Sequence, residues 1–288
     1  MSFKVLVLGS NGMAGHVISL YLQEQGHDVY GFARTDAKVL DQYYVGDIQD
    51  FLNLKKIVDE GKFDFIINAI GLLNKFADKN PDQAVLINSY LPQYLKKVTE
   101  DINTKIIQIS TDCVFSGKKG GYLVNDLRDG ESFYDLSKIL GEINDNKNLT
   151  FRNSIIGPDI KKNGVGLFNW FMKKKGTING YTRVYWSGVT TITLAKAIHK
   201  AMESGFTGIY QLTNNDKISK YNLLKLFNEY FKDNSVTILK NDTMQSDKSL
   251  INERKDLDFI VPSYRAMIEE MYEWVSLHGI YDHYHMEV

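Results

Sequence analysis

The sequence has little that would tie the protein to an oxidising compartment, a membrane or a nucleic acid. Cys113 is its single cysteine, which excludes an intramolecular disulfide and fits a reducing compartment. No apolar run approaches the roughly 18 residues of a membrane span, and the N-terminal run breaks at Gly9, so we expect no signal peptide. The 34 Lys and Arg residues balance 35 Asp and Glu, a formal net charge of −1 that gives nucleic acid no reason to bind. The six histidines show no metal-ligand spacing. We therefore expect a cytoplasmic protein with no metal and with no nucleic-acid or membrane partner.

What the sequence does contain, at its start, is a glycine-rich turn between an apolar run and a helical pattern. The run Val5 to Leu8 is typical of a buried parallel strand, and glycines follow it with the spacing G-x-x-G-x-x-G. Gly9 allows the sharp exit from the strand, Gly12 lets the backbone approach a pyrophosphate, and Gly15 lets the next helix pack close to the sheet. That helix would direct its N-terminal dipole at the phosphates. We expect the turn to bind a dinucleotide through Gly9, Asn11, Gly12, Met13 and Gly15.

Strands alternate with helices through the first half of the 288 residues, and 43% hydrophobic content is ample for a core. This alternation predicts an α/β fold with a doubly wound parallel sheet, which binds ligands at the carboxyl ends of its strands. Helices are predicted at 13–25, 81–100 with a kink at Pro92, 167–175, 193–204, 221–231 and 264–278. Strands are predicted at 28–33, 43–45, 63–70, 105–110 and 208–213.

The end of the second predicted strand indicates which dinucleotide binds. NAD-preferring sites place an acid there to bind the ribose 2′-hydroxyl, whereas a nearby arginine accommodates the 2′-phosphate of NADP. This strand ends in Ala33 and is followed by Arg34, so we expect NADP(H). We further expect the cofactor to contact residues at the ends of the next two strands, namely Asp47, Ile48, Asn68 and Ala69.

The fifth predicted strand delivers a hydroxyl, and a tyrosine and a lysine follow it on one helix face. Thr111 stands at the strand end, and Tyr134 and Lys138 are one helical turn apart. An adjacent ammonium favours the phenolate of a tyrosine, which makes Tyr134 a candidate acid–base catalyst. Lys138 would also reach the nicotinamide ribose, so both residues are expected to contact the cofactor.

These residues resemble the motifs of the extended short-chain dehydrogenase/reductases, and among them the dTDP-4-dehydrorhamnose reductase-like sugar-nucleotide enzymes. The resemblance is carried by Gly9 to Gly15, Ser110 to Phe115, Tyr134 to Lys138 and Arg152 to Pro158. It implies NADPH-dependent reduction of the 4-keto group of a UDP- or dTDP-linked 4-keto-6-deoxyhexose, as used in deoxysugar and polysaccharide biosynthesis. In that scheme Thr111 polarises the carbonyl, Tyr134 donates the proton and Lys138 tunes Tyr134.

The same resemblance implies an architecture and a substrate pocket. A Rossmann domain of residues 1–156 and about 187–213 would carry a smaller C-terminal substrate-binding lobe of about 157–186 and 214–288, and the protein would form a homodimer. Asn153 would contact the nucleotide sugar. In the segment Asn179 to Thr190, Trp186 could stack on the base and Arg183 could pair with the diphosphate, although a core aromatic and an exposed arginine explain them equally well.

Cys113 suggests a second activity. In bifunctional epimerase/reductases that resemble this chain, such as GDP-fucose synthase, a cysteine two residues after the catalytic Ser or Thr works with a His or Lys about forty residues beyond the tyrosine. On an extended strand end Cys113 would share the side of Thr111, while Asp112 would face away. Counting forward from Tyr134 reaches Lys173 as the partner base, with Lys174 as the alternative register. We therefore expect epimerisation at C3, or at C3 and C5, before reduction at C4, against the alternative of a buried cysteine and an exposed lysine.

Two other classes of protein share this fold. One is a non-catalytic NADP-binding regulatory subunit, like that of methionine adenosyltransferase, which has no physical need for the hydroxyl, phenol and ammonium of Thr111, Tyr134 and Lys138. The other is a 4,6-dehydratase or 4-epimerase that retains NAD. Dehydratases carry an Asp-Glu pair after the catalytic threonine, whereas this chain has Asp112 and Cys113.

Overall fold

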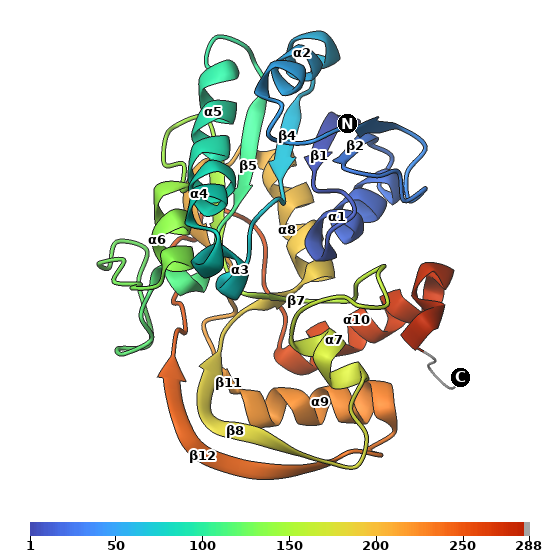
Figure 1. Cartoon of the computed structure of the whole chain (residues 1–288), viewed down its shortest axis with the longest axis vertical. Helices are drawn as coiled ribbons and strands as arrows, with labels where there is room; N and C mark the ends of the chain where they lie inside the picture. The colour runs from blue at the N-terminus through green and yellow to red at the C-terminus, as the bar shows by residue number, and fades with distance from the viewer. Residues whose placement is uncertain (285–288) are drawn as a thin grey trace.

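A computed structural model describes residues 1–284 and is built on a seven-stranded sheet (Figure 1). The strand order is β10-β6-β5-β4-β1-β2-β3, and every neighbouring pair is parallel. The strands are β1 (Lys4–Leu8), β2 (Asp28–Ala33), β3 (Tyr43–Val45), β4 (Phe65–Asn68), β5 (Lys105–Ile109), β6 (Leu149–Arg152) and β10 (Gly208–Gln211). The chain moves outward from β1 to β3, then returns to β4 on the other side of β1. The sheet therefore has its topological switch point between β1 and β4, where such folds bind ligands. This confirms the predicted Rossmann-type α/β fold.

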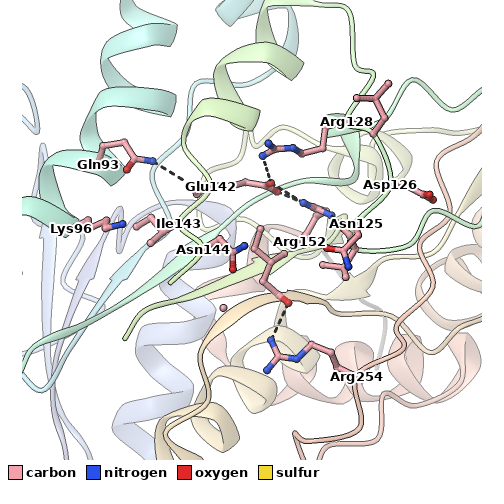
Figure 2. Close-up of a pocket in the computed structure, with 14 residues that line it drawn as sticks. Gln93, Lys96, Asn125, Asp126, Arg128, Glu142, Ile143, Asn144, Arg152 and Arg254 are labelled. Carbon is pink, nitrogen blue, oxygen red and sulfur yellow. Dashed lines mark hydrogen bonds and ion pairs between the residues drawn. The ribbon is translucent and has the colours of Figure 1, made fainter. Parts of the chain in front are cut away.

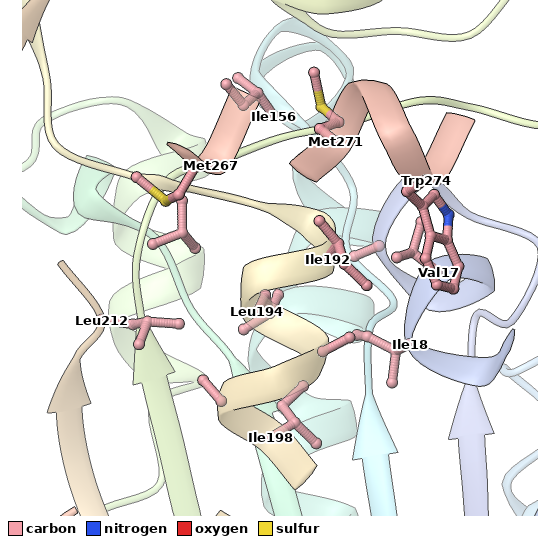
Figure 3. Close-up of a cluster of buried hydrophobic side chains, with 14 of the residues drawn as sticks. Val17, Ile18, Ile156, Ile192, Leu194, Ile198, Leu212, Met267, Met271 and Trp274 are labelled. Atoms are coloured by element: carbon pink, nitrogen blue, oxygen red, sulfur yellow. The ribbon is translucent and has the colours of Figure 1, made fainter. Parts of the chain in front are cut away.

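Helices cover both faces of the sheet, and the side chains of each buried strand alternate between these two faces. Val5 and Val7 enter one hydrophobic cluster, whereas Leu6 and Leu8 enter another. The first cluster lies under α1 (Met13–Glu24), α8 (Thr191–Ser204) and α10 (Tyr264–Leu277), as Figure 3 shows. The second lies under α2 (Phe51–Gly61) and α5 (Leu91–Val98). Helices on both faces leave the carboxyl ends of the strands as the edge open to ligands.

A second, smaller sheet follows in the C-terminal part of the chain, below the large sheet in Figure 1. Its order is β11-β8-β12, from β8 (Thr177–Trp186), β11 (Ile218–Ser219) and β12 (Thr237–Asp247), with α7 (Leu167–Met172) and α9 (Lys220–Lys232) nearby. A short pair, β7 (Ile155–Ile156) with β9 (Val189–Thr190), leads into it. The two-part domain division stays a prediction, although the strands of the two sheets fall on either side of its boundaries.

The helix predicted over 81–100 is interrupted. It runs through α4 (Pro81–Ala84), a π-helical turn η1 (Val85–Tyr90) and α5, so the irregularity precedes Pro92 rather than sitting at it. The reason is that Pro92 lacks an N–H and cannot bond to the carbonyl of Asn88 four residues earlier. That carbonyl instead faces α6 (Phe133–Leu140): a Cβ added at Gly141, just after α6, would lie 1.9 Å from it. Glycine thus allows the two helices to approach closely.

The remaining elements are short. They are α3 (Asn74–Lys79), η2 (Asp112–Val114) and η3 (Gly279–Tyr284). Among residues 1–284, no helix combines the length and the apolar character needed to cross a bilayer.

Candidate active site

The glycine-rich turn is shaped by contacts that only glycine tolerates. Gly9 has a φ of +82°, and its carbonyl accepts a hydrogen bond from the Gly12 amide at 2.8 Å. A Cβ added at Gly15 would lie 2.1 Å from the Gly9 carbonyl oxygen, and one at Gly12 would lie 3.2 Å from it. Because α1 begins at Met13, its first amides lie directly against this turn. The glycines therefore let α1 pack directly against the turn, because side chains at these positions would collide with the Gly9 carbonyl.

The turn is fastened to the end of β2. The Asn11 side chain donates to the carbonyl of Thr35, and it accepts a hydrogen bond from the Tyr43 hydroxyl at 2.8 Å. Arg34 is exposed directly after β2, where the sequence predicts the 2′-phosphate of NADP. Asn11 thus orients the turn, while the Arg34 guanidinium is left accessible.

The other predicted cofactor residues differ in what they offer a ligand. Asn68 is buried, and its side chain donates to Gln108 at 2.8 Å and accepts from the Ile70 amide at 3.2 Å. It therefore shapes the loop after β4, whose next residue, Ala69, packs against Gly9. Asp47 is exposed and Ile48 is buried.

The candidate catalytic residues meet at the carboxyl end of β5. The Thr111 hydroxyl lies within hydrogen-bonding reach of the Tyr134 phenol, which is 6% exposed. A capping box between Ser132 and Asp135 begins α6 and fixes Tyr134 on its first turn. Burial raises the pKa of Tyr134, against the sequence-based expectation that Lys138 would lower it. The phenol therefore holds its proton.

Lys138 lies one turn further along α6, as predicted. Its ammonium is buried and donates to the Ile109 carbonyl at 2.8 Å. Burial lowers the pKa of Lys138 to about 8, although Glu142 opposes that shift. Asn88, which the sequence analysis missed, supports the same region: its side chain bridges the Leu72 backbone and the Ser137 hydroxyl. No local pattern singles out Asn88, because its role depends on the π-helical turn.

Cys113 also reaches this cluster, but by a different route from the one predicted. Residues 112–114 form a 3₁₀ turn, in which the Thr111 hydroxyl accepts a hydrogen bond from the Cys113 amide at 3.1 Å. Because the backbone is not extended there, Asp112 does not face away; it is buried beside Thr111. Burial, with Asp112 adding to it, raises the pKa of Cys113 to about 12. Cys113 is therefore a thiol at neutral pH.

Two lysines from the C-terminal part of the chain lie beside Cys113, and neither is Lys173. Lys248, just after β12, lies within hydrogen-bonding reach of the Cys113 thiol. Lys220, the first residue of α9, lies near Asp112 and Cys113, and burial lowers its pKa. Lys173 is instead exposed at the end of α7, so the predicted pairing of Cys113 with Lys173 is not supported. Counting along the chain from Tyr134 cannot find Lys248 or Lys220, because both come from distant parts of the sequence.

The predicted substrate residues fall into three environments. Both amide atoms of Asn153 are buried without a hydrogen-bond partner among the described residues. Such an orphaned amide beside a catalytic strand suits a ligand. Arg183 is exposed and pairs with Gln245. Trp186 is 3% exposed and packs against Tyr264 in the core, so it cannot stack on a base from this position.

A cavity of about 680 Å³ lies away from this cluster, beside the edge of the large sheet (Figure 2). Its floor is the buried ion pair of Arg152 with Glu142, joined by two hydrogen bonds of 2.8 Å. Arg128 and the Ser110 hydroxyl also bind Glu142. Burial alone would raise the pKa of Glu142, but these partners outweigh it and lower the pKa. Because the charges of Arg152 and Glu142 are already paired with each other, this cavity offers little to a ligand. The ion pair instead supports the strand end before Thr111, through the hydrogen bond from Ser110 to Glu142.

The large parallel sheet with its glycine-rich turn, and the Tyr134–Lys138 pair on α6, give the chain the fold of the extended short-chain dehydrogenase/reductases. The chain belongs to the RmlD substrate binding domain family, whose model matches residues 3–248. No group of His, Cys, Asp and Glu side chains within residues 1–284 is arranged to hold a metal ion.

Similar proteins agree with this assignment. A probable low-salt glycan biosynthesis reductase, Agl14, of Haloferax volcanii is 32% identical over 139 residues, which are 47% of this chain and 46% of that relative. The match thus spans less than half of Agl14. The spore coat polysaccharide biosynthesis protein SpsK of Bacillus subtilis is 27% identical over 224 residues, 76% of each chain. A crystal structure of dTDP-4-dehydrorhamnose reductase from Bacillus anthracis in complex with NADP has the same fold, with a TM-score of 0.80, 22% identity, and coverage of 95% of this chain and 100% of that one.

Proposed function

We propose that the protein is an NADPH-dependent reductase of the 4-keto group of a UDP- or dTDP-linked 4-keto-6-deoxyhexose. The observation that carries this proposal is that the Thr111 hydroxyl lies beside the Tyr134 phenol, with the Lys138 ammonium one helical turn away at the end of β5. Similarity to a glycan biosynthesis reductase and to dTDP-4-dehydrorhamnose reductase supports the substrate class.

The residues present fit a dinucleotide that carries a 2′-phosphate. Gly12 and Gly15 keep the turn tight against α1, since a Cβ at either position would crowd the Gly9 carbonyl, and Arg34 rather than an acid follows β2. The Bacillus anthracis reductase with the same fold binds NADP, which supports the same choice here. When bound, NADPH supplies the hydride for the carbonyl carbon.

The protein's own residues supply the proton and stabilise the charge on oxygen. Thr111 donates a hydrogen bond to the ketone oxygen and so favours negative charge there. Tyr134, kept protonated by burial, transfers its phenolic proton to that oxygen as the hydride reaches carbon. The phenolate that results lies one helical turn from the ammonium of Lys138, which stabilises it. Asn153, with its unpartnered amide, is suited to hydrogen-bond the sugar nucleotide.

The test is NADPH oxidation with UDP- and dTDP-linked 4-keto-6-deoxyhexoses, followed at 340 nm. Tyr134→Phe removes the proton donor and should lower kcat roughly 10²- to 10⁴-fold while NADPH still binds. Tyr90→Phe alters an exposed tyrosine on the π-helical turn and should leave kcat unchanged.

Turnover of no substrate by a protein that binds NADPH would reject the reductase. A regulatory subunit would instead retain a stoichiometric enzyme partner with no change in the redox state of the dinucleotide. A 4,6-dehydratase or 4-epimerase would carry NAD as purified.

We also propose that epimerisation next to the ketone precedes reduction. Epimerisation needs a base to remove a proton from the carbon beside the ketone and an acid to return one on the other face. Cys113, protonated at neutral pH, suits the acid, and the thiolate left behind would lie against the Lys248 ammonium. Lys220, whose pKa burial lowers, suits the base. Thr111 and Tyr134 would hold the enolate oxygen.

A further inference from the structure

A second cavity, of about 400 Å³, lies between the glycine-rich turn and the C-terminal end of the chain. Asn11 and Thr35 form one side, where the turn is fastened to the end of β2. Ile160 and Lys161, from the loop after β7, and Ile280, from η3, form the other side. The cavity therefore adjoins the place where Arg34 leaves β2, while the rest of its wall comes from the loop after β7 and from η3 near the C-terminus.

Lys161 is the one cation that lines this cavity within residues 1–284. Its side chain is exposed, and its ammonium forms no ion pair or hydrogen bond with any described residue. Some surface lysines elsewhere are paired, such as Lys118 with Glu131 and Lys217 with Asp247, each at 2.5 Å. An unpaired ammonium beside a cavity is available to an anionic ligand.

The C-terminal segment η3 holds both sides of the cavity in place. The Tyr284 hydroxyl accepts a hydrogen bond from the Asp159 amide at 2.8 Å, and the Asp159 carboxylate in turn accepts from the Lys161 amide at 2.9 Å. On the other side, the Tyr281 hydroxyl lies 2.7 Å from His16 Nε2. His16 Nδ1 lies 2.8 Å from the carbonyl of Gly12, in the glycine-rich turn. One segment thus sets the position of the loop of Lys161 relative to the turn.

We propose that this cavity binds the 2′-phosphorylated ribose of an adenine nucleotide, with Lys161 as a second cation beside Arg34 and with η3 as the element that fixes their spacing. The proposal rests on the NADPH specificity proposed above. A phosphate monoester carries close to two negative charges at neutral pH, so one arginine leaves charge for a second cation to bind. The family model ends at residue 248, so η3 lies outside the part of the chain that it matches.

Isothermal titration of the full-length protein with adenosine 2′,5′-bisphosphate and with ADP tests the assignment, because only the first carries the 2′-phosphate. Lys161→Ala should weaken binding of adenosine 2′,5′-bisphosphate roughly tenfold, the effect of losing one charge-assisted hydrogen bond, and should leave ADP unchanged. Lys162→Ala removes the same charge one residue away, at an exposed position that does not line the cavity, and should change neither affinity.

The outcomes separate this inference from the proposed function. A wild-type protein that binds both nucleotides equally would overturn the NADPH assignment itself. A wild-type protein that prefers adenosine 2′,5′-bisphosphate, with that preference lost in Arg34→Ala but kept in Lys161→Ala, would overturn the role of Lys161 and leave the reductase standing.

Tyr284→Phe tests the part played by η3. It removes the acceptor of the Asp159 amide without touching the cavity wall, so we expect a loss of a few-fold in affinity for adenosine 2′,5′-bisphosphate with ADP unaffected. Unchanged affinity for both nucleotides, in a variant with an unchanged melting temperature, would overturn the role of η3.

Discussion

At the scale of single residues, the site combines groups that lie close together in sequence with groups that only the fold brings together. Tyr134 and Lys138 share one face of α6, and the glycines of the turn follow one strand, so local spacing predicts both. Lys248 reaches Cys113 from just after β12 and Lys220 from the start of α9, and no spacing relates residues that far apart. Counting along the chain points to Lys173, but such counting cannot report how α7 is oriented.

The proposed epimerisation depends on Cys113 and the lysines around it. Incubation of the substrate in D₂O without NADPH should introduce deuterium into the sugar ring, because the carbon beside the ketone exchanges its proton through the enolate. Cys113→Ser should slow this uptake by removing the thiol acid, and Lys248→Met should slow it by removing the charge beside the thiolate. Lys173→Met is the matched control and should exchange as the wild type does.

Several results would contradict that prediction. No uptake in the wild type would leave a reductase alone, and wild-type uptake in Cys113→Ser would exclude the cysteine. Slowed uptake in Lys173→Met together with normal uptake in Lys248→Met would restore the partner that the sequence predicted.

At the scale of elements, the regular parts of the fold follow from hydrophobic patterning. The short run that forms β1 predicts a buried strand, and its alternate residues do enter opposite clusters. The segment Asn179 to Thr190 has no such pattern, because most of β8 is only partly buried in its small sheet; in the structure, residues 177–186 form a ten-residue strand. Hydrophobic patterning does not predict the π-helical turn either, since this turn arises from Pro92 and from the close approach of Gly141 after α6.

That π-helical turn should be important for both stability and catalysis. Asn88 is buried within it, and Asn88→Ala would leave the Leu72 amide and carbonyl and the Ser137 hydroxyl without this partner. We expect the free energy of unfolding to fall by about 2 kcal/mol, the usual cost of unsatisfied buried groups, with kcat also reduced. Kcat should fall because the Asn88 side chain and the Lys138 ammonium border the same position, Gly71.

Urea unfolding and steady-state kinetics of the same preparation measure both effects. Asn80→Ala is the control, since Asn80 is exposed and donates only to the Phe76 carbonyl of its own helix; it should cost less than about 0.5 kcal/mol. Equal losses of stability in the two variants would show that the turn has no special role.

At the scale of the whole molecule, a chain of hydrogen bonds joins the two ends of the sequence. Trp274 Nε1 donates to the Tyr281 hydroxyl, which lies 2.7 Å from His16 Nε2, 265 residues away in sequence. His16 Nδ1 lies 2.8 Å from the Gly12 carbonyl, so a single neutral tautomer, with its proton on Nδ1, satisfies every contact. Burial lowers the pKa of His16 from 6.5 to about 4, with Asp159 opposing and His278 adding to the shift. The connection is therefore intact only while His16 is neutral.

This dependence predicts how stability changes with pH. Between pH 6.5 and about 4, the unfolded chain binds a proton at His16 that the folded protein does not, so the free energy of unfolding must fall as the pH falls. By pH 4, protonation linked to His16 has lowered the free energy of unfolding by about 3 kcal/mol, at about 1.4 kcal/mol for each unit of pKa shift. Urea unfolding at pH 7, 6, 5 and 4.5 should show that the free energy of unfolding falls more steeply with decreasing pH in the wild type than in His16→Gln. The carboxylates titrate equally in both proteins, but the variant lacks the imidazole of residue 16. Parallel curves would mean that His16 is protonated in the folded protein as readily as in the unfolded chain, and that the C-terminal segment is held to the glycine-rich turn by packing alone.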